Sequence, residues 1–122
     1  MADKLLIVMM NSNPHEAIEV VPPISQAIVA VAMEFDVEMV FTGRSAGLLK
    51  KGVAAQIPLA ADRTATVHDL IKEAVQAGVH FKVCSAGIEY WGEDIIPEVE
   101  ETVGGAYIIS EAMDNATVTF TY

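Results

Sequence analysis

The only cysteine of the chain, Cys84, is the side chain best suited to covalent chemistry. It ends an alternating apolar and polar run that predicts a strand over 79–84. The small residues that follow it, which are expected to open a helix, are Ser85, Ala86 and Gly87. Backbone N–H groups at the start of a helix stabilise an anion, so a thiol here is expected to be partly ionised and reactive. The alternative is an inert cysteine in the core, because cysteine is among the most buried residue types.

Two polar residues that follow other predicted strands are candidates for the same site. Asn11 comes after the apolar run 4–10, and Arg44 comes after the predicted strand 37–42. In open α/β sheets, ligands bind outside the carboxyl ends of the strands, where these residues are expected to lie. We therefore predict Asn11 and Arg44 as binding residues beside the cysteine. For Arg44 the alternative is an ordinary solvated arginine.

Several other thiol, phosphate and metal chemistries are excluded by missing residues. A tyrosine-phosphatase loop places an arginine where this chain has Tyr90, and a thioredoxin-type motif needs a second cysteine. Neither a Walker A loop nor a GxGxxG motif follows the first predicted strand. The histidines are too scattered for a metal site: His80 lies ~13 Å along its strand from the cysteine. Only His15, in the loop after the first strand, could approach the thiol. We expect no metal and no organic cofactor.

The elements that must position these residues alternate along the chain. Apolar runs predict strands over 4–10, 37–42 and 79–84, a weak strand over 99–103 and a terminal strand over 116–122. Helical segments separate them, which predicts a single-domain α/β protein with a mostly parallel sheet of about five strands and helices on both faces, flavodoxin-like or Rossmann-like. The whole chain, 1–122, is expected to form this one domain.

Local patterns give finer expectations. Pro22 and Pro23 are expected to separate a short turn from a full helix, and Glu38 suggests a strand nearer the edge of the sheet. Thr66 is the predicted N-cap of the clearest helix, with His68 solvated on its polar face. The acidic stretch 93–101 is expected to be a solvated face, with docking of a basic partner as the alternative.

The composition limits the possible partners. The chain has 122 residues, 52% of them apolar, and a net charge of -10. Nucleic acid and anionic membrane surfaces are disfavoured because both require clustered Lys and Arg. No apolar run reaches the ~18 residues that span a bilayer, and the N-terminus lacks the features of a signal peptide. One cysteine cannot form an internal disulfide, so the cytoplasm is the expected compartment. The apolar excess predicts a sheet covered on both faces, burial against a second copy, or both.

Four segments of the sequence resemble the DsrE/DsrF-like family, which includes TusD-type sulfur relay proteins. They are the apolar first strand, FTGRSAGLLKKG, TVHDLIKEAVQAGVHFKVCSAG and the closing GGAYIISEAMDNATVTFTY. These segments are distributed along nearly the whole length of the chain. The most specific part is the helix, strand and cysteine between Thr66 and Gly87. The resemblance implies a sulfur carrier whose Cys84 accepts sulfane sulfur, as a persulfide or thiosulfonate, and passes it to a partner thiol.

The resemblance also implies partners. These are a TusA-like carrier, a rhodanese or a heterodisulfide-reductase-like protein, and a homotrimer or hexamer is the implied assembly. Whether the chain is a carrier or a sulfurtransferase-like enzyme is left open. Two alternatives also stay open: a redox sensor in which Cys84 reacts with peroxide, and a flavodoxin-like module that binds a small anion with the cysteine incidental.

Overall fold

The computed structural model describes residues 3–61 and 64–122. The sequence around Pro58 predicts a loop over 53–63, of which residues 62–63 lie outside the described residues. Five parallel strands form a single sheet in the order β4-β3-β2-β1-β5. This confirms the predicted α/β class and the strand count. The strands are β1 (Lys4–Met9), β2 (Asp36–Phe41), β3 (His80–Cys84), β4 (Val99–Val103) and β5 (Thr117–Thr121).

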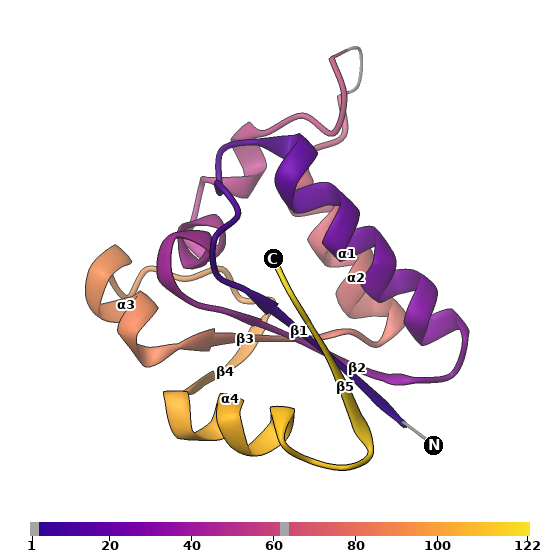
Figure 1. The fold of residues 1–122 in the computed structure, drawn as a ribbon. Helices are drawn as coiled ribbons and strands as arrows, with labels where there is room; N and C mark the ends of the chain where they lie inside the picture. The colour runs from indigo at the N-terminus through magenta and orange to yellow at the C-terminus, as the bar shows by residue number, and fades with distance from the viewer. Residues whose placement is uncertain (1–2, 62–63) are drawn as a thin grey trace.

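Helices cover both faces of the sheet, as predicted (Figure 1). Helices α1 (Ala17–Ala32) and α2 (Val67–Ala77) lie side by side on one face, and α4 (Gly105–Ala112) lies on the other. The short helix α3 (Ser85–Trp91) and two 3-10 segments gather at the carboxyl ends of the strands. These segments are η1 (Gly43–Leu49) and η2 (Ala54–Gln56).

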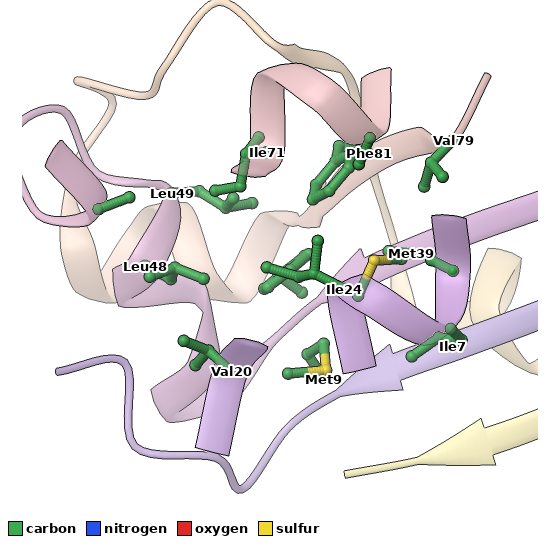
Figure 2. Close-up of a cluster of buried hydrophobic side chains, with 14 of the residues drawn as sticks. Ile7, Met9, Val20, Ile24, Met39, Leu48, Leu49, Ile71, Val79 and Phe81 are labelled. Atoms are coloured by element: carbon green, nitrogen blue, oxygen red, sulfur yellow. The ribbon is translucent and has the colours of Figure 1, made fainter. Parts of the chain in front are cut away.

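Strand alternation divides the apolar residues between the two faces. Side chains beneath α1 and α2 form the main core (Figure 2). Within it the rings of Phe41 and Phe81 stack with centroids 5.7 Å apart. A smaller apolar cluster lies on the other face, beneath α4. Its buried members are Leu6, Val8, Val40 and Val103.

Helix α2 begins and ends where the sequence predicts. The Thr66 side chain accepts a hydrogen bond from the backbone N–H of Asp69, and the Asp69 carboxylate accepts one from the backbone of Thr66. This reciprocal capping box satisfies two donors that the helix itself cannot. Gly78 ends the helix with φ 118°, a conformation that glycine adopts at little cost.

The two prolines do not break the first helix, so that prediction is wrong. Helix α1 runs continuously over Ala17–Ala32 with Pro22 and Pro23 inside it. An interior proline removes a helical hydrogen bond and usually costs ~3 kcal/mol. The first turn is nevertheless held by a bond from the Val20 N–H to the Glu16 carbonyl, and both Val20 and Pro23 are buried against the core. Burial of Val20 and Pro23 offsets the helical hydrogen bonds that the two prolines cannot donate.

The prediction that Glu38 marks a strand near the edge is also wrong. Its strand, β2, is the middle strand of the five, and only 4% of Glu38 is exposed. The carboxylate is tolerated there because cationic and hydroxyl groups from neighbouring elements surround it, as described below.

Candidate functional site

Cys84 is the last residue of β3 and the N-cap of α3, which confirms the predicted strand–cysteine–helix order. Its Cα is paired with that of Val103, the last residue of β4. Strand alternation places its side chain on the same face as Lys82, the face that α4 covers. Only 6% of the residue is exposed, so the thiol is buried in this conformation of a single chain. A reactive role therefore requires access that the closed chain does not give.

The small residues after the cysteine open α3, as the sequence predicts. Ser85 and Ala86 are exposed, whereas Gly87 is buried against η1. A Cβ at Gly87 would lie 2.7 Å from the Cβ of Ala46, so this glycine is required for packing. That the backbone amides of these residues hold an anion stays a prediction.

The two aromatic residues at the end of α3 have different surroundings: Trp91 is packed against η1, and Tyr90 is exposed. The Trp91 indole donates a hydrogen bond of 2.9 Å to the Gly43 carbonyl, and its ring lies against Gly47. Tyr90, by contrast, is 80% exposed. Trp91 therefore fixes α3 on η1, while the Tyr90 side chain faces solvent.

Asn11 and Arg44 lie at the carboxyl edge of the sheet, in the segments that follow β1 and β2. Both are exposed, as is His15. Among residues 3–61 and 64–122, no hydrogen bond or ion pair joins any of the three to the cysteine. Their participation in a site with Cys84 stays a prediction.

One contact at this edge escaped the sequence analysis. The buried Ser45 hydroxyl donates a hydrogen bond of 2.9 Å to the carbonyl of Ser12. This bond joins the segment after β1 to η1, and it thereby fixes the backbone of the residues that directly follow Asn11 and Arg44. A serine in a turn gives no sequence signal for such a contact.

A buried polar network beneath α4 is the other feature that the sequence analysis missed. The Glu38 carboxylate accepts hydrogen bonds from Lys4 at 2.8 Å and from the Tyr107 hydroxyl at 2.5 Å. Lys82 lies 3.2 Å from the same carboxylate and donates to the Tyr107 oxygen at 2.7 Å. Lys4 also donates to Glu111 of α4. The available signal was the presence of Glu38 and Lys82 at inward positions of apolar strands.

The contacts within the network keep Glu38 and Lys82 charged near neutral pH. Burial alone would raise the pKa of Glu38, but hydrogen bonds from Lys4, Tyr107 and Lys82 outweigh it and lower that pKa. Burial and the bond to Glu38 raise the pKa of Tyr107, so the phenol stays neutral. Burial would lower the pKa of Lys82, yet its bonds to Glu101, Tyr107 and Glu38 raise it. The network therefore binds α4 to the sheet rather than moving protons.

Two histidines pair with the acidic stretch 93–101. Its Glu93, Asp94, Glu100 and Glu101 are exposed, as the sequence predicts, whereas Glu98 is partly buried. His68 Nε2 lies 2.8 Å from the Glu98 carboxylate, and the His68 side chain is only 19% exposed. The solvated position predicted for His68 is therefore wrong, because the segment before β4 folds over its helix. His80 Nδ1 lies 2.7 Å from Glu100, at about half exposure. Burial would raise the pKa of Glu98, but the hydrogen bond from His68 lowers it.

The described residues contain no cluster of three or more His, Cys, Asp or Glu side chains arranged for a metal ion. Among the same residues, no helix has the length and apolar character to cross a membrane.

Two cavities lie along the edges of the sheet. A groove of about 520 Å³ between α1 and the edge strand β5 is almost entirely apolar. It is lined by Lys4, Leu5, Gln26, Val29, Ala30, Met33, Phe35, Val118 and Phe120. A second, more polar cavity of about 360 Å³ lies beside β4, near Ile88 of α3 and Glu101. Neither includes Cys84 in its lining.

The strand order and layers define a single-domain α/β fold, and two solved structures share it. The YchN protein from E. coli has 13% sequence identity and a TM-score of 0.76, with 100% of both chains covered. The conserved protein of unknown function BT1422 from Bacteroides thetaiotaomicron has 15% identity and a TM-score of 0.67, covering 98% of this chain and 95% of that one. No family model matches the sequence. No curated protein matches it either. At these sequence identities the likeness shows the fold alone.

Proposed function

We propose that the protein is a sulfur carrier that accepts sulfane sulfur on Cys84. The observation that carries this proposal is the position of the cysteine: it ends a parallel strand and begins a helix at the edge where α/β sheets bind ligands. The resemblance of the sequence to DsrE/DsrF-like proteins supports the same role. The backbone amides of Ser85, Ala86 and Gly87 would stabilise the negative sulfur, with Asn11 and Arg44 at the same edge.

The proposed chemistry needs only a thiolate and a donor sulfur–sulfur bond. The Cys84 thiolate attacks the outer sulfur of a persulfide on a donor protein, the donor's S–S bond breaks, and the donor thiolate leaves. Cys84 then carries a persulfide. The thiolate of an acceptor attacks its terminal sulfur and releases Cys84 unchanged, so no net oxidant or reductant is consumed. Because the chain has one cysteine, each transfer must take place between proteins.

Substitution of the cysteine tests the proposal directly. We expect wild-type protein incubated with polysulfide or a persulfidated donor to gain the mass of sulfur in an intact-mass spectrum. Cys84→Ser should keep the fold, because the residue is small and its φ of -74° is ordinary, and it should gain nothing. An adduct on the serine variant would contradict the assignment. A wild-type thiol that reacts with peroxide but not with polysulfide would favour the redox sensor instead.

The proposed partners follow from the resemblance. Donors or acceptors would be a TusA-like carrier, a rhodanese or a heterodisulfide-reductase-like protein. We also propose a reducing compartment, the cytoplasm, because a lone free thiol suits it. Transfer assays with each purified partner class, read by the mass of both proteins, would identify the direction of flow.

We further propose that the chain associates with itself, as a homotrimer or hexamer, through the surface around β5. The opposite edge strand, β4, carries Glu100 and Glu101 and an irregular register with β3, features that discourage edge pairing. Strand β5 has no charged residue or proline, and Val118 and Phe120 are 45% and 43% exposed beside the apolar groove. Copies that each carry a net charge of -10 would associate best through such an uncharged surface. Light scattering of wild type and Phe120→Ser would show whether the assembly depends on it.

A further inference from the structure

Helix α4 has a weak apolar hold on the sheet face that contains Cys84. None of its residues is fully buried, and its apolar contribution consists of three partly buried side chains. These are Tyr107, Ile108 and Ala112, packed against the small cluster beneath the helix. Helix α1 on the opposite face, by comparison, buries Val20, Pro23, Ile24, Ala27 and Ala30. The cover over the cysteine face is therefore the lighter of the two.

Polar contacts supply much of the remaining attachment. The Tyr107 hydroxyl bridges Glu38 and Lys82, and the Glu111 carboxylate accepts a hydrogen bond from Lys4. Tyr107 and Glu111 are four residues apart on α4, so they share the face that points at the sheet. We call these two side chains the clamp. Water can replace such bonds when the helix leaves, so breaking them costs less than their strength in isolation suggests.

A pair of glycines begins α4 beside the cysteine. Gly104 directly follows Val103, whose Cα is paired with that of Cys84, and Gly105 is the first residue of the helix. A Cβ at either glycine would meet nothing within 4 Å, and the φ of Gly104, -97°, is open to any residue. Packing therefore does not require glycine here. What two glycines supply is conformational freedom in the backbone that joins α4 to the sheet.

We propose that α4 is a gate over Cys84. In the closed state only 6% of the Cys84 residue is exposed. Release of the clamp, with rotation or fraying of the backbone at Gly104 and Gly105, uncovers the carboxyl end of β3 and admits a reagent to the sulfur. The purpose of the gate rests on the proposed function: it would admit a sulfur donor and protect the loaded cysteine from solvent.

Native-state alkylation of Cys84 by iodoacetamide, followed by intact mass, tests the gate. Removing the clamp with Tyr107→Phe and Glu111→Gln together should speed alkylation about 10-fold or more, because bonds to charged groups are lost. Gly104→Ala with Gly105→Ala should slow it about five-fold, because alanine restricts the backbone of the open state and so makes opening less favourable. Tyr90→Phe and Glu89→Gln, the same changes at exposed positions of α3, should leave the rate unchanged.

Urea dependence separates gating from global unfolding. If α4 opens alone, the alkylation rate should rise with urea far less steeply than the unfolding equilibrium does, because little surface is exposed. Hydrogen exchange of a peptide over 104–113 should then accelerate in the clamp variant while that of β1 stays unchanged. The gate is overturned if alkylation follows the full urea dependence of unfolding, or if the clamp and glycine variants react at the wild-type rate.

The experiments can reject the gate and the sulfur-carrier function independently of each other. Alkylation that follows the α4 variants, in a protein that takes no sulfur from any donor, would keep the gate and remove the proposed function. Sulfur loading of Cys84 at a rate indifferent to the clamp and glycine variants would keep the function and remove the gate.

Discussion

The two faces of the sheet are built in different ways. Beneath α1 and α2, side chains from β1, β2 and β3 join the helices in one continuous apolar core (Figure 2). Beneath α4, only a small apolar cluster exists, and the space beside it holds the network of Glu38, Lys4, Lys82 and Tyr107.

Because of this difference, one face of the sheet supplies most of the stability of the domain, and the other can give access to Cys84. Exposing apolar side chains to water is unfavourable and no new contact offsets the cost, so the face beneath α1 and α2 opens only when the whole domain unfolds. Polar contacts can be exchanged for water, so the α4 face can open at a smaller cost. The cysteine lies on the second face. A domain of this kind can expose its one thiol without losing its fold.

The largest expected effect comes from the apolar face. Phe81 is fully buried and stacks on Phe41, so Phe81→Ala should lower the free energy of unfolding by about 3–5 kcal/mol. Ile108→Ala on α4 is the matched truncation on the other face. Because Ile108 is only partly buried, it should cost less than half as much. Urea unfolding followed by Trp91 fluorescence measures both, and equal costs would contradict the contrast between the faces.

The next effect comes from the charged face. Glu38→Gln removes the carboxylate that Lys4 and Lys82 share, leaving the partly buried ammonium of Lys4 and the buried one of Lys82 with weaker partners. We expect a loss of about 3 kcal/mol in unfolding free energy, at the low end for breaking a buried pair, because Glu111 and Glu101 remain. The same urea experiment at neutral pH measures it. A loss below that of an exposed pair such as Lys51 and Asp94 would contradict the network's importance.

The pH dependence of that variant sharpens the test. The pKa of Glu38 is lowered in the folded protein, so its contribution is present above the pKa of the unfolded chain and is lost as pH falls through the folded value. Protonated Glu38 resembles glutamine. The difference between wild type and Glu38→Gln should therefore be largest at neutral pH and shrink in acid. A constant difference from pH 7 downward would show that the carboxylate charge is not the cause.

The sequence predicts what depends on local pattern. Thr66 and Asp69 form the expected capping box, and Gly78 ends that helix. The strand over 99–103 and the strand–Cys84–helix order are also where pattern alone places them. Each of these features depends on residues close together in the chain, because caps and periodicity are local properties.

The features that the sequence misses depend on distant residues. Glu38 suggests an edge strand only until β1 and β3 bring lysines to either side of it, and Tyr107 reaches the carboxylate across 69 positions of the chain. His68 looks solvated until Glu98, 30 positions away, folds beside it. The burial of Cys84 has the same origin, because position at a strand end predicts the edge but not what covers it.

The smallest expected effect concerns an unsatisfied hydroxyl on the charged face. Removing it should raise the free energy of unfolding, whereas the substitutions above lower it. Thr119 of β5 pairs with Leu6, and its hydroxyl is buried without a hydrogen-bond partner among the described residues. Thr119→Val keeps the shape, removes the unsatisfied hydroxyl, and should raise the free energy of unfolding by about 1 kcal/mol. Thr117→Val on the same strand, whose hydroxyl is not trapped in this way, is the matched control and should gain less. If both variants gain equally, the improvement comes from strand preference rather than from relief of the buried group. A gain specific to Thr119 would show that the closed α4 face withholds from this hydroxyl a hydrogen bond that water would supply on opening.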